Sequence, residues 1–277
     1  MTEKRPTGVL SLSPLRGQLP HQVEPRGDGA ENDEERRMTM KKYELTEETK
    51  RMFGRTLHRI RAVRDFDDVH AGDLGGWIAK EDNLSHSGSA WVYEEAMVFD
   101  DAKVCYSAKV RGDAVVFNNA IIDEEAEISG HAVVSGNAHI WGQAKIAGNA
   151  RVTDHAHVWG QAQVDGYAGI GGNARIAGDT VVCGGAKLFD NTTIRGGARI
   201  TSAADRLCIG SIGSRDGYIT FYRGRRGAIM VACGCFDGTI DEFAEQVARV
   251  HGDSRYGRAY RAAIALARTV LSDEQEG

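Results

Sequence analysis

Two six-residue segments of the chain carry the side chains best suited to chemistry. Their sequences are His139-Ile-Trp-Gly-Gln-Ala144 and His157-Val-Trp-Gly-Gln-Ala162, and equivalent positions are eighteen residues apart. An unperturbed imidazole has a pKa near ~6.5, so either histidine is a candidate general base. The indoles of Trp141 and Trp159 offer flat faces on which a planar group can stack. Together these residues predict a ligand-binding shelf.

Three further side chains extend this ligand-binding interpretation: Gln143, Gln161 and Arg175. Their amide and guanidinium groups can donate hydrogen bonds to a bound ligand. The alternative is that identical residues, one turn of the chain apart, form a ladder that fills a subunit interface. The sequence favours this alternative, because no carboxylate stands at a spacing that obviously orients either histidine.

A second candidate site lies near the C-terminus, where Arg223, Arg225 and Arg226 fall at a predicted hairpin turn. Three arginines can grip a phosphate or a carboxylate. They also fit a solvated hairpin tip that resists edge-to-edge pairing, which is the interpretation we favour. Cys233-Gly-Cys235 lacks the spacing of a redox or zinc pair and has no second pair beside it, so we predict no metal site.

The histidines, tryptophans and glutamines of the first candidate site lie within a repeat that fills residues 90–203. The phrase Ala-x-Val/Ile-x-Gly-x occurs there nineteen times without an insertion or a deletion. Two apolar positions separated by one variable residue predict a short strand, and the residues that follow them are turn formers. Three hexads close a coil of eighteen residues, so we expect a mainly β solenoid of about six triangular coils. Ala and its aliphatic neighbour would line the interior.

Residues eighteen apart should then lie over one another in columns on the outside of the coils. One column is polar (Lys109, Glu127, Lys145, Gln163), one is apolar, and one holds the two histidines. Exposed apolar columns are rarely left in water. We therefore expect a subunit interface, most simply in a homotrimer. The residues predicted to form it are Met97, Phe99, Val115, Phe117, Val133 and Ile121.

The repeat resembles that of the hexapeptide-repeat left-handed β-helix proteins. Within them it is similar to the YdcK-like branch and related phage or prophage proteins, through units such as Ala132-Val-Val-Ser-Gly-Asn137. The resemblance covers roughly residues 41–203 and implies a left-handed parallel β-helix that trimerises. The acyltransferases of this family usually place Gly, Asp, Glu or Ala directly after the aliphatic residue, and they commonly carry a projecting loop. Here Gly comes one position later and no loop interrupts the repeat.

The change of pattern along the chain predicts four segments. All four prolines fall in the first, which we expect to be disordered or a non-native extension. We predict a strand over Leu57–Val63, a turn over 72–76, and a capping box at Thr239–Glu242 that opens the first of two helices. The segments are 1–37, an N-terminal β cap over 38–83, the left-handed β-helix over 84–203, and a C-terminal α+β domain over 204–277 with a β-hairpin and two helices.

Composition restricts the classes of partner and the cellular compartment that we expect for the protein. The net charge of −5 over 277 residues argues against general nucleic-acid binding. No apolar run approaches membrane-spanning length, and the N-terminus lacks the apolar core of a signal peptide. The chain has five cysteines, which is a small and odd number for a disulfide framework. We therefore expect a protein of the reducing cytoplasm.

Three functional hypotheses follow. The leading one is a non-catalytic trimeric scaffold or binding protein of phage or prophage origin that contacts a host component and needs no cofactor. The second is an acyltransferase that uses acyl-CoA, with His139 or His157 as the general base. The third is a protein that sequesters a small nucleotide or metabolite between subunits, against Trp141 and Trp159.

Overall fold

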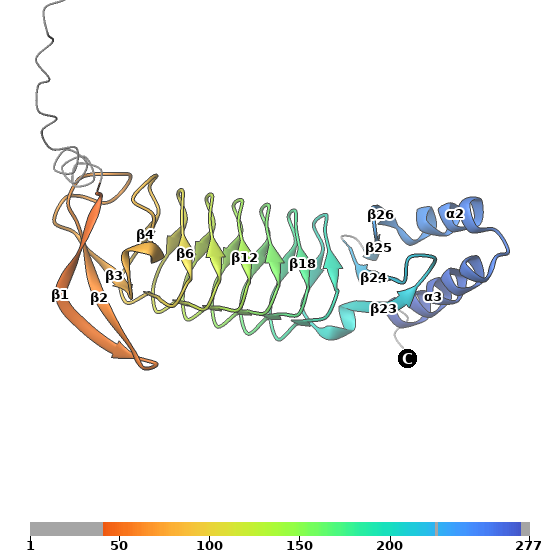
Figure 1. The fold of residues 1–277 in the computed structure, drawn as a ribbon. Helices are drawn as coiled ribbons and strands as arrows, with labels where there is room; N and C mark the ends of the chain where they lie inside the picture. Colours follow the sequence, from red (N-terminus) through yellow and green to blue (C-terminus); the bar gives the residue numbers. More distant parts are fainter. Residues whose placement is uncertain (1–40, 225–226, 273–277) are drawn as a thin grey trace, which may run out of the picture. The chain divides into compact units, whose positions relative to one another are not determined.

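The computed structural model of the protein describes residues 41–224 and 227–272. The segment predicted to be disordered, 1–37, lies outside the described residues, as do Arg225 and Arg226. The described chain runs from antiparallel cap strands through a parallel β-solenoid to a C-terminal α+β unit (Figure 1).

Each of the nineteen hexads forms one short strand, and the strands stack into the three faces of the solenoid. The first face contains β3 (Leu74–Ile78), β5 (Met97–Val98), β8 (Val115–Val116), β11 (Val133–Val134), β14 (Arg151–Val152), β17 (Gly169–Ile170) and β20 (Lys187–Leu188). The second contains β4 (Trp91–Val92), β7 (Lys109–Val110), β10 (Glu127–Ile128), β13 (Lys145–Ile146), β16 (Gln163–Val164), β19 (Val181–Val182) and β22 (Arg199–Ile200). The third contains β6 (Lys103–Val104), β9 (Ile121–Ile122), β12 (His139–Ile140), β15 (His157–Val158), β18 (Arg175–Ile176) and β21 (Thr193–Ile194).

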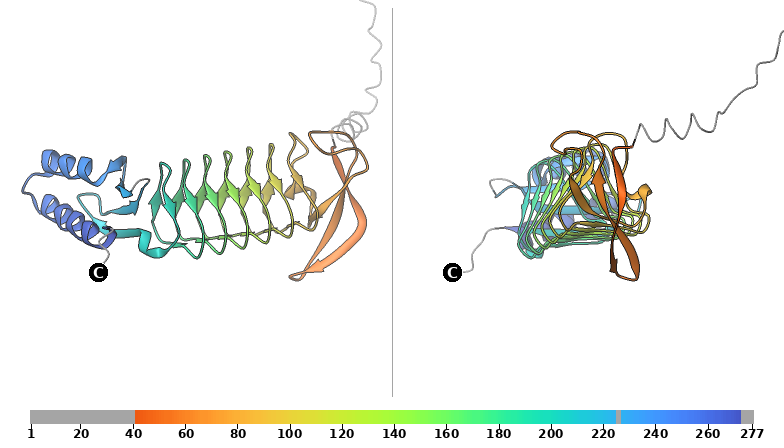
Figure 2. Two further views of the ribbon diagram at one scale, coloured as in Figure 1. Left: turned by 180° about the vertical axis from the view of Figure 1, so that it is seen from behind. Right: turned by 90° about the vertical axis from the view of Figure 1, so that its left-hand side faces the viewer.

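The side chains of the first and third residues of each repeat line the interior of the solenoid. Ala144 and Ile146 are fully buried, and the same holds along the repeat. Where threonine replaces alanine, its hydroxyl is satisfied inside: Oγ1 of Thr180 donates to the Ala177 carbonyl and Oγ1 of Thr192 to the Phe189 carbonyl, both at 2.7 Å. The predicted inward and outward positions are confirmed, and in Figure 2 the coils lie over one another when viewed end-on.

In every hexad but the last, the fifth residue turns the corner in the left-handed backbone region. Gly136 has φ of 71° and Asp154, one turn later, has φ of 59°. Glycine has no Cβ to clash in this region, and Asn and Asp tolerate it better than other residues. This backbone requirement explains why glycine and short polar residues dominate the corner.

The solenoid has about seven turns rather than the six expected. The additional strand is β3, which pairs in parallel with β5 through Trp77 and Met97. The expectation of a turn over 72–76 was therefore wrong from Leu74 onward. Gly75 is buried, and a Cβ there would lie 2.6 Å from Cγ1 of Ile60 and from Cζ2 of Trp91. Close packing, and not a tight turn, accounts for this glycine.

The cap adds an antiparallel hairpin to the first face. It consists of β1 (Tyr43–Met52) and β2 (Arg55–Ala62), and β2 pairs with β3. The 3-10 turn η1 (Glu81–Asn83) follows β3. Leu57 and Trp77 pack against Met97 and Phe99, which are only 8% and 3% exposed. The expectation that Met97 and Phe99 are exposed for a subunit interface is wrong, because the chain's own hairpin covers them.

The C-terminal unit follows the turn η2 (Ala203–Asp205). Its antiparallel sheet contains β23 (Arg206–Ile212), β24 (Gly217–Arg223), β25 (Ile229–Cys233) and β26 (Phe236–Thr239). The helices α2 (Ile240–His251) and α3 (Arg255–Leu271) pack on it through Ile219, Phe221, Val231, Phe243 and Ile264.

Both helices and the capping box between Thr239 and Glu242 are confirmed, whereas β26 was not expected. This unit bonds directly to the last turn of the solenoid: the Thr193 amide donates to Oγ1 of Thr220, and the Arg195 amide donates to the Tyr222 hydroxyl. No helix in the described ranges has the length and apolar content needed to span a membrane.

Candidate functional site

The third face of the solenoid brings the two predicted histidines and tryptophans together. His139 of β12 lies directly beside His157 of β15 in the parallel ladder. The Trp141 and Trp159 rings stack with centroids 4.9 Å apart and planes within 1° of parallel. The centroids of the His139 and Trp141 rings are 4.4 Å apart. The strict eighteen-residue period creates this cluster, because each residue repeats at the same point of the next turn.

A carboxylate that the sequence analysis missed completes the cluster. Oδ2 of Asp123 lies 3.1 Å from Nε2 of His139. The expectation that no carboxylate orients either histidine is therefore wrong. Asp123 stands eighteen residues before Trp141, at the same corner one turn earlier. The pairing runs diagonally, from a corner to the next turn's strand, so a comparison within one column does not show it.

Asp123 belongs to an acidic run whose three members all bond to the next turn. Oε2 of Glu124 accepts from the Gly142 amide and Oε2 of Glu125 accepts from Nε2 of Gln143, both at 2.8 Å. These bonds fix the corner on which Asp123 stands. The predicted ligand contact Gln143 thus holds a partner inside the chain.

Two polar atoms of the cluster are buried without a hydrogen-bond partner, Oδ1 of Asp123 and Nδ1 of His157. Burial lowers the pKa of His157, and the charge of Arg175, together with that of His139 when it is protonated, lowers it further. A neutral His157 therefore lies beside His139, whose ring nitrogen Nε2 faces a carboxylate. The two equivalent histidines of the repeat have different environments.

The remaining predicted contacts are more scattered. Gln161 and Arg175 are exposed on the same side of the solenoid, and Arg175 lies beside His157 in the ladder. Arg223 ends β24, where its Nη2 donates to the Ser272 carbonyl at 3.5 Å. The hypothesis of an arginine cluster with Arg225 and Arg226 falls on residues that the structure does not describe.

The rest of the predicted subunit interface remains on the surface. Val115, Phe117 and Val133 are half-buried, and Ile121 is 37% exposed. Phe117 stacks on Phe99 with ring centroids 5.2 Å apart, so it continues the surface that the hairpin covers. An interface through these four residues stays a prediction.

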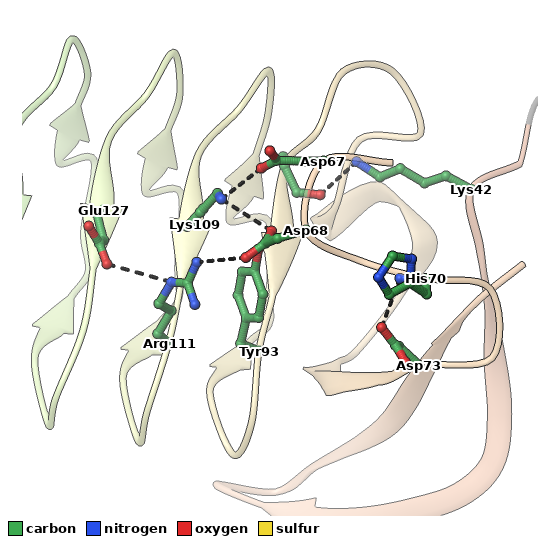
Figure 3. Close-up of polar contacts among 10 residues, drawn as sticks. Lys42, Asp67, Asp68, His70, Asp73, Tyr93, Lys109, Arg111 and Glu127 are labelled. Atoms are coloured by element: carbon green, nitrogen blue, oxygen red, sulfur yellow. Dashed lines mark hydrogen bonds and ion pairs between the residues drawn. The ribbon is translucent and has the colours of Figure 1, made fainter. Parts of the chain in front are cut away.

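A separate polar cluster lies on the second face, where the cap loop meets the solenoid (Figure 3). The Tyr93 hydroxyl donates to Oδ1 of Asp68 at 2.6 Å, and Nζ of Lys109 lies 2.7 Å from Oδ2 of Asp67. The Tyr93 hydrogen bond is the largest influence that lowers the pKa of Asp68 to about 2, while burial and the same bond raise the pKa of Tyr93 to about 12. Arg111 lies over the Tyr93 ring. Each charge has an opposite partner, so this cluster anchors the loop.

The third face is therefore the better candidate for chemistry. Among the residues that the structure describes, no group of three His, Cys, Asp or Glu side chains is arranged to hold a metal ion. An imidazole that donates from Nε2 to a carboxylate carries its lone pair on Nδ1 and can accept a proton there. The His139 and Asp123 pair can act as an oriented general base, beside two indole faces that can stack a planar group.

Comparison with known proteins finds a similarity that covers part of the chain. Over 82 residues the chain is 34% identical to the uncharacterized acetyltransferase YdcK of Escherichia coli (strain K12), a match that covers 26% of this chain and 25% of that protein. The chain thus matches about a quarter of the length of this relative. No protein-family model matches the chain.

Proposed function

We propose that the protein is an acyltransferase that uses acyl-CoA, with His139 as general base and Asp123 as the carboxylate that orients it. The observation that carries the proposal is the 3.1 Å contact between Nε2 of His139 and Oδ2 of Asp123. A base whose ring is held by a third group is the recurrent arrangement in acyl transfer. The partial similarity to a protein named as an acetyltransferase supports the same class of reaction.

In the proposed reaction, Nδ1 of His139 removes a proton from an acceptor hydroxyl or amine. The acceptor oxygen or nitrogen attacks the thioester carbonyl, and the tetrahedral intermediate collapses with cleavage of the carbon–sulfur bond. The proton then passes from the imidazolium to the departing CoA thiolate, so the products are the acylated acceptor and CoA. Asp123 stabilises the imidazolium while it carries the proton.

A second subunit would supply what an open solenoid face lacks. The His139 side chain is 32% exposed, and efficient acyl transfer needs a site from which water is excluded. In a homotrimer, a neighbouring solenoid against the third face would enclose His139 and the stacked indoles. We therefore propose that the protein is a cytoplasmic homotrimer with its active sites between subunits. Light scattering, which measures the mass of the assembly, tests the trimer.

Release of CoA from acetyl-CoA, measured with a thiol reagent and a panel of amino and hydroxyl acceptors, tests the proposal. The H139Q variant should lose activity by about 10²- to 10⁴-fold, the usual contribution of a general base, while CoA still binds. H131Q is the matched control, because His131 also faces an aspartate, Asp113 at 3.5 Å, but is 67% exposed at another corner. A wild-type protein that neither binds CoA nor releases it contradicts the proposal.

A non-catalytic trimeric scaffold is the second proposal. Its support is the uninterrupted repeat, since nineteen hexads form strands with no projecting loop between them. Phage origin and a host partner, the finer parts of that hypothesis, have no support in the relative found and stay predictions. Absence of turnover together with specific capture of a macromolecule would favour it over the acyltransferase.

A further inference from the structure

A pocket of about 550 Å³ lies where the last turns of the solenoid meet the C-terminal unit. The solenoid contributes Arg175, Asn191, Thr193 and Arg195, and the C-terminal unit contributes the opposite wall. Pockets of this volume are typical of sites for small organic molecules. The pocket depends on the C-terminal unit, so the repeat alone does not create it.

The charge of the pocket is unbalanced. Its lining includes Arg175, Arg195 and Arg215 but no aspartate or glutamate. In the part of the chain that the structure describes, none of these three arginines forms an ion pair with a carboxylate. The chain as a whole has 39 acidic and 34 basic residues, so an unpaired basic lining is not a consequence of composition.

Arg195 makes the case for a ligand stronger. Its Nε is buried and has no hydrogen-bond partner. Its backbone is fixed by the Tyr222 hydroxyl, which accepts from the Arg195 amide at 3.3 Å and donates to the Arg195 carbonyl at 3.2 Å. A guanidinium N–H withdrawn from water costs free energy unless an acceptor binds it. Because this Nε is closed to solvent, an oxyanion in the pocket would bind the remaining N–H groups of Arg195, which lines the pocket.

The wall that the C-terminal unit contributes holds Arg215 and His251 together with aromatic and apolar side chains. Tyr218 is 46% exposed, and Phe236 and Val247 line the same pocket. Gln246 adds an amide that can pair with polar edges of a ring. Aromatic side chains beside positive charge suit a ligand that joins a planar ring to an anionic group.

We infer that this pocket binds the monophosphate ester of an aromatic body, with a nucleoside monophosphate as the representative ligand. A phosphate monoester carries a charge of about −1.5 to −2 near neutral pH and three acceptor oxygens, which matches several guanidinium groups better than a single carboxylate does. The base would lie against Tyr218 and Phe236. This site is distinct from the His139 pair, because Arg175 lies two strands along the ladder from His139.

Isothermal titration of the full chain with UMP and AMP tests the inference, with uridine, adenosine and benzoate as comparison ligands. We expect the monophosphates to bind at least tenfold more tightly than the nucleosides and than benzoate. R195Q and R215Q should each weaken UMP binding by about tenfold or more, as expected for loss of a charge-assisted bond. Thermal melting of each variant shows whether it is folded.

R199Q is the matched control, because Arg199 is an exposed arginine on the second face and is not part of the pocket lining. It should bind UMP as the wild type does, and so should H139Q. Equal binding of uridine and UMP would overturn the inference. So would a folded R195Q that keeps wild-type affinity, or failure of the wild type to bind either monophosphate. Tighter binding of benzoate than of UMP would overturn the assignment to phosphate.

Discussion

Oδ2 of Asp123 lies 3.1 Å from Nε2 of His139, although sixteen residues separate the two in the chain. The contact crosses from the corner of one turn to the strand of the next, and the neighbouring bonds of Glu124 and Glu125 hold that corner in place. The aspartate therefore has a fixed relation to the imidazole before any ligand binds. Such preorganisation is what an oriented base requires.

The first prediction concerns Asp123 as a positioning residue. D123N keeps the shape of the side chain but removes the charge that stabilises a protonated His139, so kcat should fall by about 10- to 10³-fold. KM for acetyl-CoA should change little, because Asp123 acts through His139. Steady-state kinetics over a range of pH measures both. E125Q is the control: a wild-type kcat in D123N, or an equal loss in E125Q, contradicts the assigned role.

The second prediction concerns the buried Gly75 of β3. A Cβ at this position would lie 2.6 Å from the side chains of Ile60 and Trp91, so G75A should destabilise the fold by about 1–3 kcal/mol, the usual cost of overpacking. A Cβ at Gly185 would meet no atom within 4 Å, and Gly185 has no positive φ, which makes G185A the matched control. Urea denaturation followed by circular dichroism compares the two. Similar midpoints would show that the cap does not pack closely on the first turns.

The third prediction tests the narrow interior. Ala150 is fully buried and Arg151, the next residue, is exposed on the adjoining strand. A150L should therefore lower stability by at least about 1–3 kcal/mol, whereas R151L should stay within about 0.5 kcal/mol of wild type. Thermal melting of both variants is the measurement. Equal melting temperatures would mean that the interior has room for a larger side chain.

The fourth prediction is a pH dependence that arises from His157. Burial holds its pKa in the folded protein below the ordinary value of 6.5. As pH falls through 6.5, the unfolded chain binds a proton at this residue before the folded protein does, so stability decreases toward acid pH. H157Q should lose less stability than wild type between pH 7.5 and pH 5.5. Parallel pH dependence in H157Q and wild type would contradict this origin.

The sequence by itself determined the solenoid, because the period of six places alanine and an aliphatic residue inside at every turn. It also determined the ladder of His139 and His157, since residues eighteen apart must stack in a coil of eighteen. Both helices of the C-terminal unit followed from capping residues and apolar spacing. Each of these features depends on a local sequence pattern or on a strict repeat, and both kinds of pattern can be recognised in the amino-acid sequence.

Only the tertiary structure decided the features that combine different columns or different segments. The pairing of Asp123 with His139 runs diagonally between columns, so the period does not specify it. The hairpin that buries Met97 and Phe99, the extra strand β3 and the pocket around Arg195 all join the repeat to segments outside it. Such contacts depend on the sizes of side chains and on the path of the chain in three dimensions. The repeating sequence pattern specifies neither of these for the segments outside the repeat.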